Sequence, residues 1–78
     1  MRKIDAELIV NEILQDRGVK LEDINDDSTF KDLGQDSLDL IEIIMEVEEI
    51  LSINIDDDIL SGNDNVSKLA EYILEVKK

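Results

Sequence analysis

The stretch from residue 37 to residue 51, SLDLIEIIMEVEEIL, repeats apolar residues at a helical spacing. At about 100° per residue, most of them fall on one side of a helical wheel, which is typical of a helix with one buried face. The sequence therefore predicts a helix over Ser37–Leu51, with a core face formed by Leu40, Ile43, Ile44, Val47, Ile50 and Leu51.

A second apolar stripe lies on the opposite side of the same wheel. Its members, Leu38, Ile41 and Met45, fall within about 60° of one another. Carboxylates lie between or beside them, at Asp39, Glu42, Glu46, Glu48 and Glu49. Two interpretations stay open: a core helix that touches neighbours on two sides, or an exposed strip that docks a partner helix or a basic groove.

Two further helices and a long loop are expected around this stretch. The first helix covers about Ile4–Arg17 and ends at Gly18, with a core face of Ala6, Val10, Ile13 and Leu14 that Leu8 and Ile9 widen. Residues 19–36 form a loop whose isolated apolar anchors are Leu21, Ile24, Phe30 and Leu33. The last helix covers about Val66–Val76, with Asp64 or Asn65 as its cap and a buried face of Val66, Leu69, Ala70 and Ile73.

Between the second and last helices, Asp56–Leu60 is expected to form one or two helical turns, followed by a loop over residues 61–64. No strand pattern or internal repeat occurs in the sequence. The predicted fold class is all-α: a small four-helix bundle with three main helices and one short helix, in a single domain over residues 1–78.

The charge is strongly acidic. Eight Lys and Arg oppose 21 Asp and Glu, for a net charge of −13, and every charged residue from Asp32 to Ser67 is acidic. Nucleic acid and anionic lipid are excluded as expected partners because their phosphates would be repelled, whereas a basic protein surface would be attracted.

No disulfide, membrane span or leader is expected. The chain has no Cys, no apolar run exceeds three residues, and Asp5 and Glu7 interrupt the N-terminal segment. We therefore expect a cytoplasmic monomer without membrane insertion.

The sequence argues against catalysis and against a metal site. There is no His or Cys, and no Lys lies near Ser37 in sequence to activate it as a nucleophile. A calcium loop that begins at Asp23 fails because Ser28 stands where Gly is required and Gly34 where Glu is required. By itself, Ser37 is best interpreted as part of a helix start, with Asp36 or Ser37 as the cap.

The segment FKDLGQDSL, from Phe30 to Leu38, resembles the modification site of the acyl carrier proteins, which are acidic, non-catalytic four-helix domains of the cytoplasm. The resemblance extends over nearly the whole chain. It implies that a phosphopantetheinyl transferase attaches 4'-phosphopantetheine from coenzyme A to Ser37, and that Asp36 and Leu38 are read by that transferase. The arm would supply the thiol that this Cys-free chain lacks.

The resemblance also implies docking residues on the helix after Ser37, for acyl-transferring and chain-elongating enzymes with basic patches. They are Asp39, Ile41, Glu42, Met45, Glu48 and Glu49, with Leu38 among the apolar contacts. Fatty-acid biosynthesis is the expected pathway. Polyketide, nonribosomal-peptide and lipid-modification pathways remain alternatives, because Glu46 and Asp56 depart from the residues common at those positions. An unmodified acidic interaction protein is a further alternative.

Overall fold

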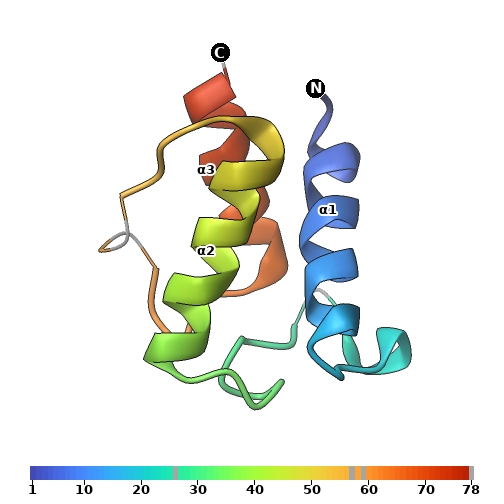
Figure 1. The fold of residues 1–78 in the computed structure, drawn as a ribbon. Coiled ribbons are helices and arrows are strands. Elements are labelled where there is room, and N and C mark those ends of the chain that lie inside the picture. The colour runs from blue at the N-terminus through green and yellow to red at the C-terminus, as the bar shows by residue number, and fades with distance from the viewer. Residues whose placement is uncertain (26, 57, 59, 78) are drawn as a thin grey trace.

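The computed structural model describes residues 1–25, 27–56, 58 and 60–77. Its main elements are α1 (Lys3–Asp16), α2 (Ser37–Leu51) and α3 (Val66–Lys77), and the 3₁₀-helix η1 (Leu21–Asp23) follows α1. Figure 1 shows α1 running in the opposite direction to α2 and α3, with both chain ends at one end of the bundle. Ser37 therefore lies at the other end, where α1 finishes and α2 begins.

These elements confirm the all-α fold class and the three main helices. The bounds of α2 agree with the prediction, and those of α1 and α3 differ from it by one residue at the ends. The predicted short helix at 56–60 includes residues 57 and 59, which lie outside the described residues. The short helix that the structure does describe, η1, lies instead in the segment expected to be a loop.

Gly18 ends α1 as predicted. Its φ of 93° lies in the left-handed region, which Gly adopts without the strain that a Cβ would cause. The N–H of Gly18 donates to the Gln15 carbonyl at 3.0 Å, and that of Val19 donates to the Leu14 carbonyl at 3.0 Å. This pair of bonds is a Schellman motif, and it turns the chain away from the helix axis after Arg17.

The three helices share one core. The structure buries the four main core-face residues predicted for α1 and the four predicted for α3, and α2 contributes Leu40, Ile43, Ile44 and Val47. Ile9 and Leu51 are partly buried against this core. Phe30 and Ile55 complete it from the connecting segments.

Three apolar residues were assigned wrongly. Leu8 is exposed because it precedes the buried Val10 by two residues, which is about 200° of helix rotation. Ile50 is exposed although it lies on the same side of α2 as the buried Ile43, two turns earlier, so that side is covered near Ile43 but not in the last turn. Leu21, expected to be a loop anchor, is also exposed.

The loop before α2 is held by Phe30, whose side chain is fully buried. The Phe30 N–H donates to the Asp64 carbonyl, and the Lys31 N–H donates to the Gly62 carbonyl, both at 2.9 Å. These bonds fasten the loop to the segment that precedes α3. The start of α2 is therefore fixed from both the core and the neighbouring loop.

Candidate functional site

The segment from Thr29 to Gln35 forms a tight turn that leads into α2. At its start, the Thr29 N–H donates to Asp32 Oδ2 and the Asp32 N–H donates to Thr29 Oγ1, each at 3.1 Å. At its end, Gly34 has a φ of 79°, and the Gln35 N–H returns to the Phe30 carbonyl at 2.9 Å. Gly34 is thus needed for its left-handed conformation, which aims the chain at the first turn of α2.

Asp36, and not Ser37, is the N-cap of α2. Asp36 Oδ1 accepts from the Asp39 N–H at 2.9 Å, and Asp39 Oδ2 accepts from the Asp36 N–H at 3.0 Å. This reciprocal pair is a capping box, which satisfies backbone donors that a helix start leaves free. It resolves the alternative that the sequence left open between the two residues.

Ser37 is the first residue of α2 and is exposed. Within the described residues, no hydrogen bond engages its hydroxyl, and the capping box of Asp36 and Asp39 is formed without it. The side chain is therefore presented at a fixed helix start without being used to build it. Such a hydroxyl is available to form an ester, and the helix N-terminus favours a negatively charged group there.

Arg17 links the end of α1 to the start of α2, a contact that the sequence analysis missed. Its Nη2 donates to Asp39 Oδ1 at 2.7 Å and to Glu42 Oε1 at 2.8 Å, and its Nε donates to Gln35 Oε1 at 3.2 Å. The Arg17 side chain is 24% exposed and that of Glu42 is 51% exposed. Sequence spacing gave no signal, since 18 to 25 residues separate Arg17 from these partners.

These contacts perturb the titration of two groups. The backbone N–H of Asp36, and after it the Arg17 guanidinium, hold the pKa of Asp39 below its ordinary value. The hydrogen bond to Glu42, with that to Asp39, raises the pKa of Arg17 above its usual value. Both groups therefore stay charged near neutral pH, and the ion pairs at the start of α2 persist there.

The second apolar stripe of α2 is exposed. The exposed fractions of Leu38, Ile41 and Met45 are 64%, 37% and 57%. The interpretation that this stripe packs against a second neighbour within the domain is therefore wrong for the described chain. An apolar strip beside carboxylates remains on the surface of the helix that Ser37 begins.

The carboxylates of α2 are held to different degrees. Glu48 Oε2 accepts from the Ile55 N–H at 2.8 Å and so fastens the segment that follows α2. Glu46 and Glu49 are exposed, and neither forms a hydrogen bond or ion pair with a side chain of the described residues.

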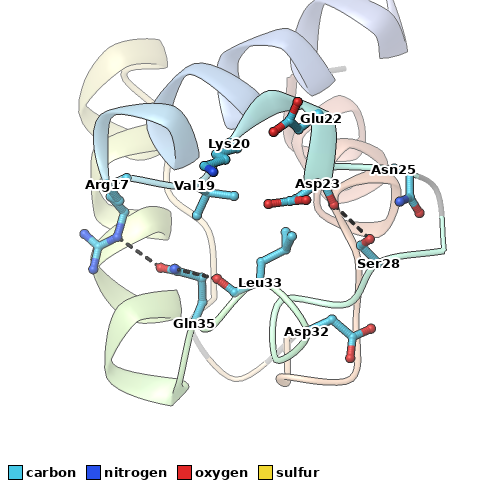
Figure 2. Close-up of a pocket in the computed structure, with 11 residues that line it drawn as sticks. Arg17, Val19, Lys20, Glu22, Asp23, Asn25, Ser28, Asp32, Leu33 and Gln35 are labelled. Carbon is cyan, nitrogen blue, oxygen red and sulfur yellow. Dashed lines mark hydrogen bonds between the residues drawn. The ribbon is translucent and has the colours of Figure 1, made fainter.

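A pocket of about 680 Å³ opens between η1 and the turn that precedes α2. Figure 2 shows Arg17 and Gln35 on one side of it, with Val19 and Leu33 between them and the acidic Asp23. The Gln35 Nε2 donates to the Leu33 carbonyl at 3.2 Å, so the wall nearest α2 is internally bonded. The lining carries groups of both charge signs and does not select one sign of ligand.

In the described part of the chain, no group of three or more His, Cys, Asp or Glu side chains could hold a metal ion. Nor does any helix there have the length and apolar character needed to cross a membrane.

Comparison with known proteins decides which family this arrangement belongs to. Residues 7–73 match the family described as a phosphopantetheine attachment site. The acyl carrier protein of Chloroherpeton thalassium is 46% identical over 67 residues, which cover 85% of this chain and 84% of that protein. That of Rickettsia bellii strain RML369-C is 35% identical over 80 residues, covering 99% of this chain and 93% of the relative.

The chain belongs to the acyl carrier protein family. The resemblance stated from the segment FKDLGQDSL is confirmed, and so is the expectation of a non-catalytic carrier with a 4'-phosphopantetheine attachment site. A non-reducing polyketide synthase of Didymella fabae also matches, with 38% identity over 60 residues that cover 77% of this chain and 2% of that protein. No solved structure matches this chain.

Proposed function

We propose that Ser37 is the attachment residue, and that the chain holds acyl groups as thioesters on the thiol of a 4'-phosphopantetheine arm. One observation carries the assignment to Ser37. Its exposed hydroxyl has no hydrogen-bond partner among the described residues, while the neighbouring Asp36 and Asp39 fix the helix start around it.

The surroundings of Ser37 fit esterification by a separate enzyme. In that reaction the serine oxygen bonds to the phosphorus that carries pantetheine, and the hydroxyl proton passes to a base. The phosphoanhydride bond of coenzyme A breaks, and adenosine 3',5'-bisphosphate leaves with the electron pair of that bond. Asp36 and Asp39 are engaged in the capping box, and the chain has no His. The base therefore belongs to the transferase, and this chain contributes an accessible oxygen at a helix N-terminus that suits the resulting phosphodiester.

Family membership implies two kinds of partner, a phosphopantetheinyl transferase and the enzymes that process the acyl group. In the proposal, the transferase reads Asp36 and Leu38 on either side of Ser37. Acyl-processing enzymes with basic patches dock on α2, with Ile41 and Met45 as apolar contacts and Asp39, Glu42, Glu48 and Glu49 as the acidic positions. The exposure of the apolar stripe supports this part of the proposal.

Fatty-acid biosynthesis is the proposed pathway. It is supported by the free-standing acyl carrier proteins that match over most of their own length. A polyketide pathway is the second candidate, favoured by the match to a segment of a polyketide synthase. The two differ in which synthase elongates the acyl chain, and the acyl groups found on the chain isolated from its host would distinguish them.

Intact-mass measurement tests the proposal. The purified chain is incubated with coenzyme A, Mg²⁺ and a promiscuous phosphopantetheinyl transferase, beside Ser37→Ala and the control Ser67→Ala, which removes a serine near the start of α3. The wild type and Ser67→Ala should each gain one phosphopantetheinyl group, and Ser37→Ala none. No gain on the wild type, or a gain on Ser37→Ala, would contradict the proposal.

A further inference from the structure

The carboxylates of α2 fall into two groups, according to whether another described residue engages them. The engaged group, held by Arg17 or by a backbone N–H, consists of Asp39, Glu42 and Glu48. The second group consists of Glu46 and Glu49, which no side chain of the described residues contacts by an ion pair. A negative charge in the sequence of α2 is therefore not equally available to a partner at every position.

Arg17 is the cause of most of this difference. A single guanidinium nitrogen, Nη2, contacts carboxylate oxygens of Asp39 and Glu42 at 2.7 and 2.8 Å. One positive charge thus stands against two negative charges at the start of the helix. A cation on a partner that approaches Glu42 must share this carboxylate with Arg17 or displace it, which weakens the attraction.

The carboxylates without such a partner lie beside the apolar stripe. Glu49 follows Met45 by four residues, so the two side chains are neighbours on the helix surface. Glu46 follows Met45 directly and lies about 100° around the helix from it, at the edge of the exposed face. Ile41 lies one turn before Met45, and both are exposed. We call these four residues, Ile41, Met45, Glu46 and Glu49, the outer patch.

We infer that Arg17 determines where on the proposed docking face of α2 a basic partner binds most strongly. It screens Asp39 and Glu42, so these two docking positions contribute less than the outer patch, which is the main receiving surface. The partner is an acyl-processing enzyme with an apolar socket for Met45 and Lys or Arg side chains placed to meet Glu46 and Glu49. Charge complementarity and exposure select this occupant: the patch is acidic around an apolar centre, as transient docking requires. The inference rests on the proposed carrier function.

The same geometry makes Arg17 a positioning residue, whose loss should change the rate at which a partner associates. When Arg17 is removed, the charge at the start of α2 becomes more negative by one, and both carboxylates turn available to a partner. Loss of a merely structural contact would leave association unchanged or slow it. Loss of a screening residue should accelerate association and steepen its dependence on ionic strength.

Association kinetics test this inference. The chain, modified at Ser37, is mixed in stopped flow with a chain-elongating synthase from Chloroherpeton thalassium, whose acyl carrier protein is similar to this chain. Glu42→Gln and Glu46→Gln form a matched pair, because both remove one charge from α2 and only Glu42 is held by Arg17. Each is measured alone and combined with Arg17→Gln, and Arg17→Lys keeps the charge while changing the geometry.

At low salt, Glu46→Gln should slow association about threefold, and Glu42→Gln less than about 1.5-fold. Arg17→Gln should accelerate association about two- to threefold, and Arg17→Lys should associate at nearly the wild-type rate. When Arg17→Gln is already present, Glu42→Gln should slow association as much as Glu46→Gln does. Thermal unfolding of each variant establishes that it is folded.

If Glu42→Gln and Glu46→Gln slow association equally when Arg17 is present, the inference is overturned. Slower association of Arg17→Gln, or no binding of the wild type, would also overturn it. A chain that is modified at Ser37 but shows one of these results refutes the role of Arg17 alone. A chain that acquires no phosphopantetheinyl group refutes the proposed function and the inference with it.

Discussion

The two halves of α2 differ in how their polar side chains are used. In the first half, Asp36 and Asp39 satisfy each other's backbone N–H groups, and Arg17 holds Asp39 and Glu42. In the second half, Glu48 accepts a hydrogen bond from the Ile55 N–H, whereas Glu46 and Glu49 are exposed and no described side chain pairs with them. The first half of α2 therefore holds Ser37 at a fixed helix start, and the second half leaves two carboxylates accessible to a partner.

The largest effect on stability is expected from Phe30, which anchors the turn that precedes α2. Phe30→Ala removes a fully buried ring and should lower the free energy of unfolding by about 3–5 kcal/mol. Urea denaturation measures the loss, and Leu38→Ala, which truncates an exposed side chain, is the control that should change little. A loss below about 1 kcal/mol for Phe30→Ala would show that the turn does not depend on this anchor.

The second largest effect on stability is expected from Asp36, the N-cap of α2. Asp36→Ala deletes the acceptor of the Asp39 N–H and should lower the free energy of unfolding by about 1 kcal/mol, as N-cap deletions do. Glu49→Ala, in the second half of α2, serves as the control and should not destabilise. Equal urea midpoints for the two variants would mean that the capping box does not stabilise α2.

The stability of the fold should also depend on the protonation of Asp39. Because the pKa of Asp39 is lower in the folded chain than its ordinary value of 3.8, the unfolded state binds more protons in that range. The stabilisation by Asp39 is therefore fully present above about pH 4 to 5 and is lost as the pH falls through the folded pKa, below 3.8. Asp39→Asn should flatten this part of the stability curve. The prediction fails if Asp39→Asn follows the wild-type curve between about pH 5 and pH 2.

The smallest effect concerns the net charge of −13. Self-repulsion predicts that moderate salt raises the melting temperature, because it screens the carboxylates. At low salt, Glu46→Gln should raise the melting temperature by roughly 1–3 °C, since it removes a charge that no described side chain pairs with. Glu42→Gln should lower it by a similar amount, because it breaks the contact with Arg17. Shifts of the same sign would show that the two carboxylates are equivalent.

Periodicity was sufficient to predict the main elements from the sequence. The bounds of α2, the buried faces of α1 and α3, and the stop at Gly18 all follow from local rules, which act over one or two helix turns. The same rules could not place Ile50, since its exposure depends on what covers the last turn of α2.

The candidate site was predicted in part. The segment around Ser37 indicated the family, and the helical wheel separated Leu38, Ile41 and Met45 from the core. The sequence did not decide between Asp36 and Ser37 as the cap, because that choice depends on backbone geometry. Nor did it predict the contacts of Arg17, because they join residues far apart in the chain. Electrostatic partners across such distances are set by tertiary packing, which no local pattern encodes.

The most direct test of the central claim is to locate the modification itself. After reaction with coenzyme A and a phosphopantetheinyl transferase, proteolytic peptides of the wild-type chain are fragmented by tandem mass spectrometry. We predict a single phosphopantetheinyl group, on the hydroxyl oxygen of Ser37. An unmodified Ser37, or the group on another serine such as Ser52 or Ser61, would contradict the account.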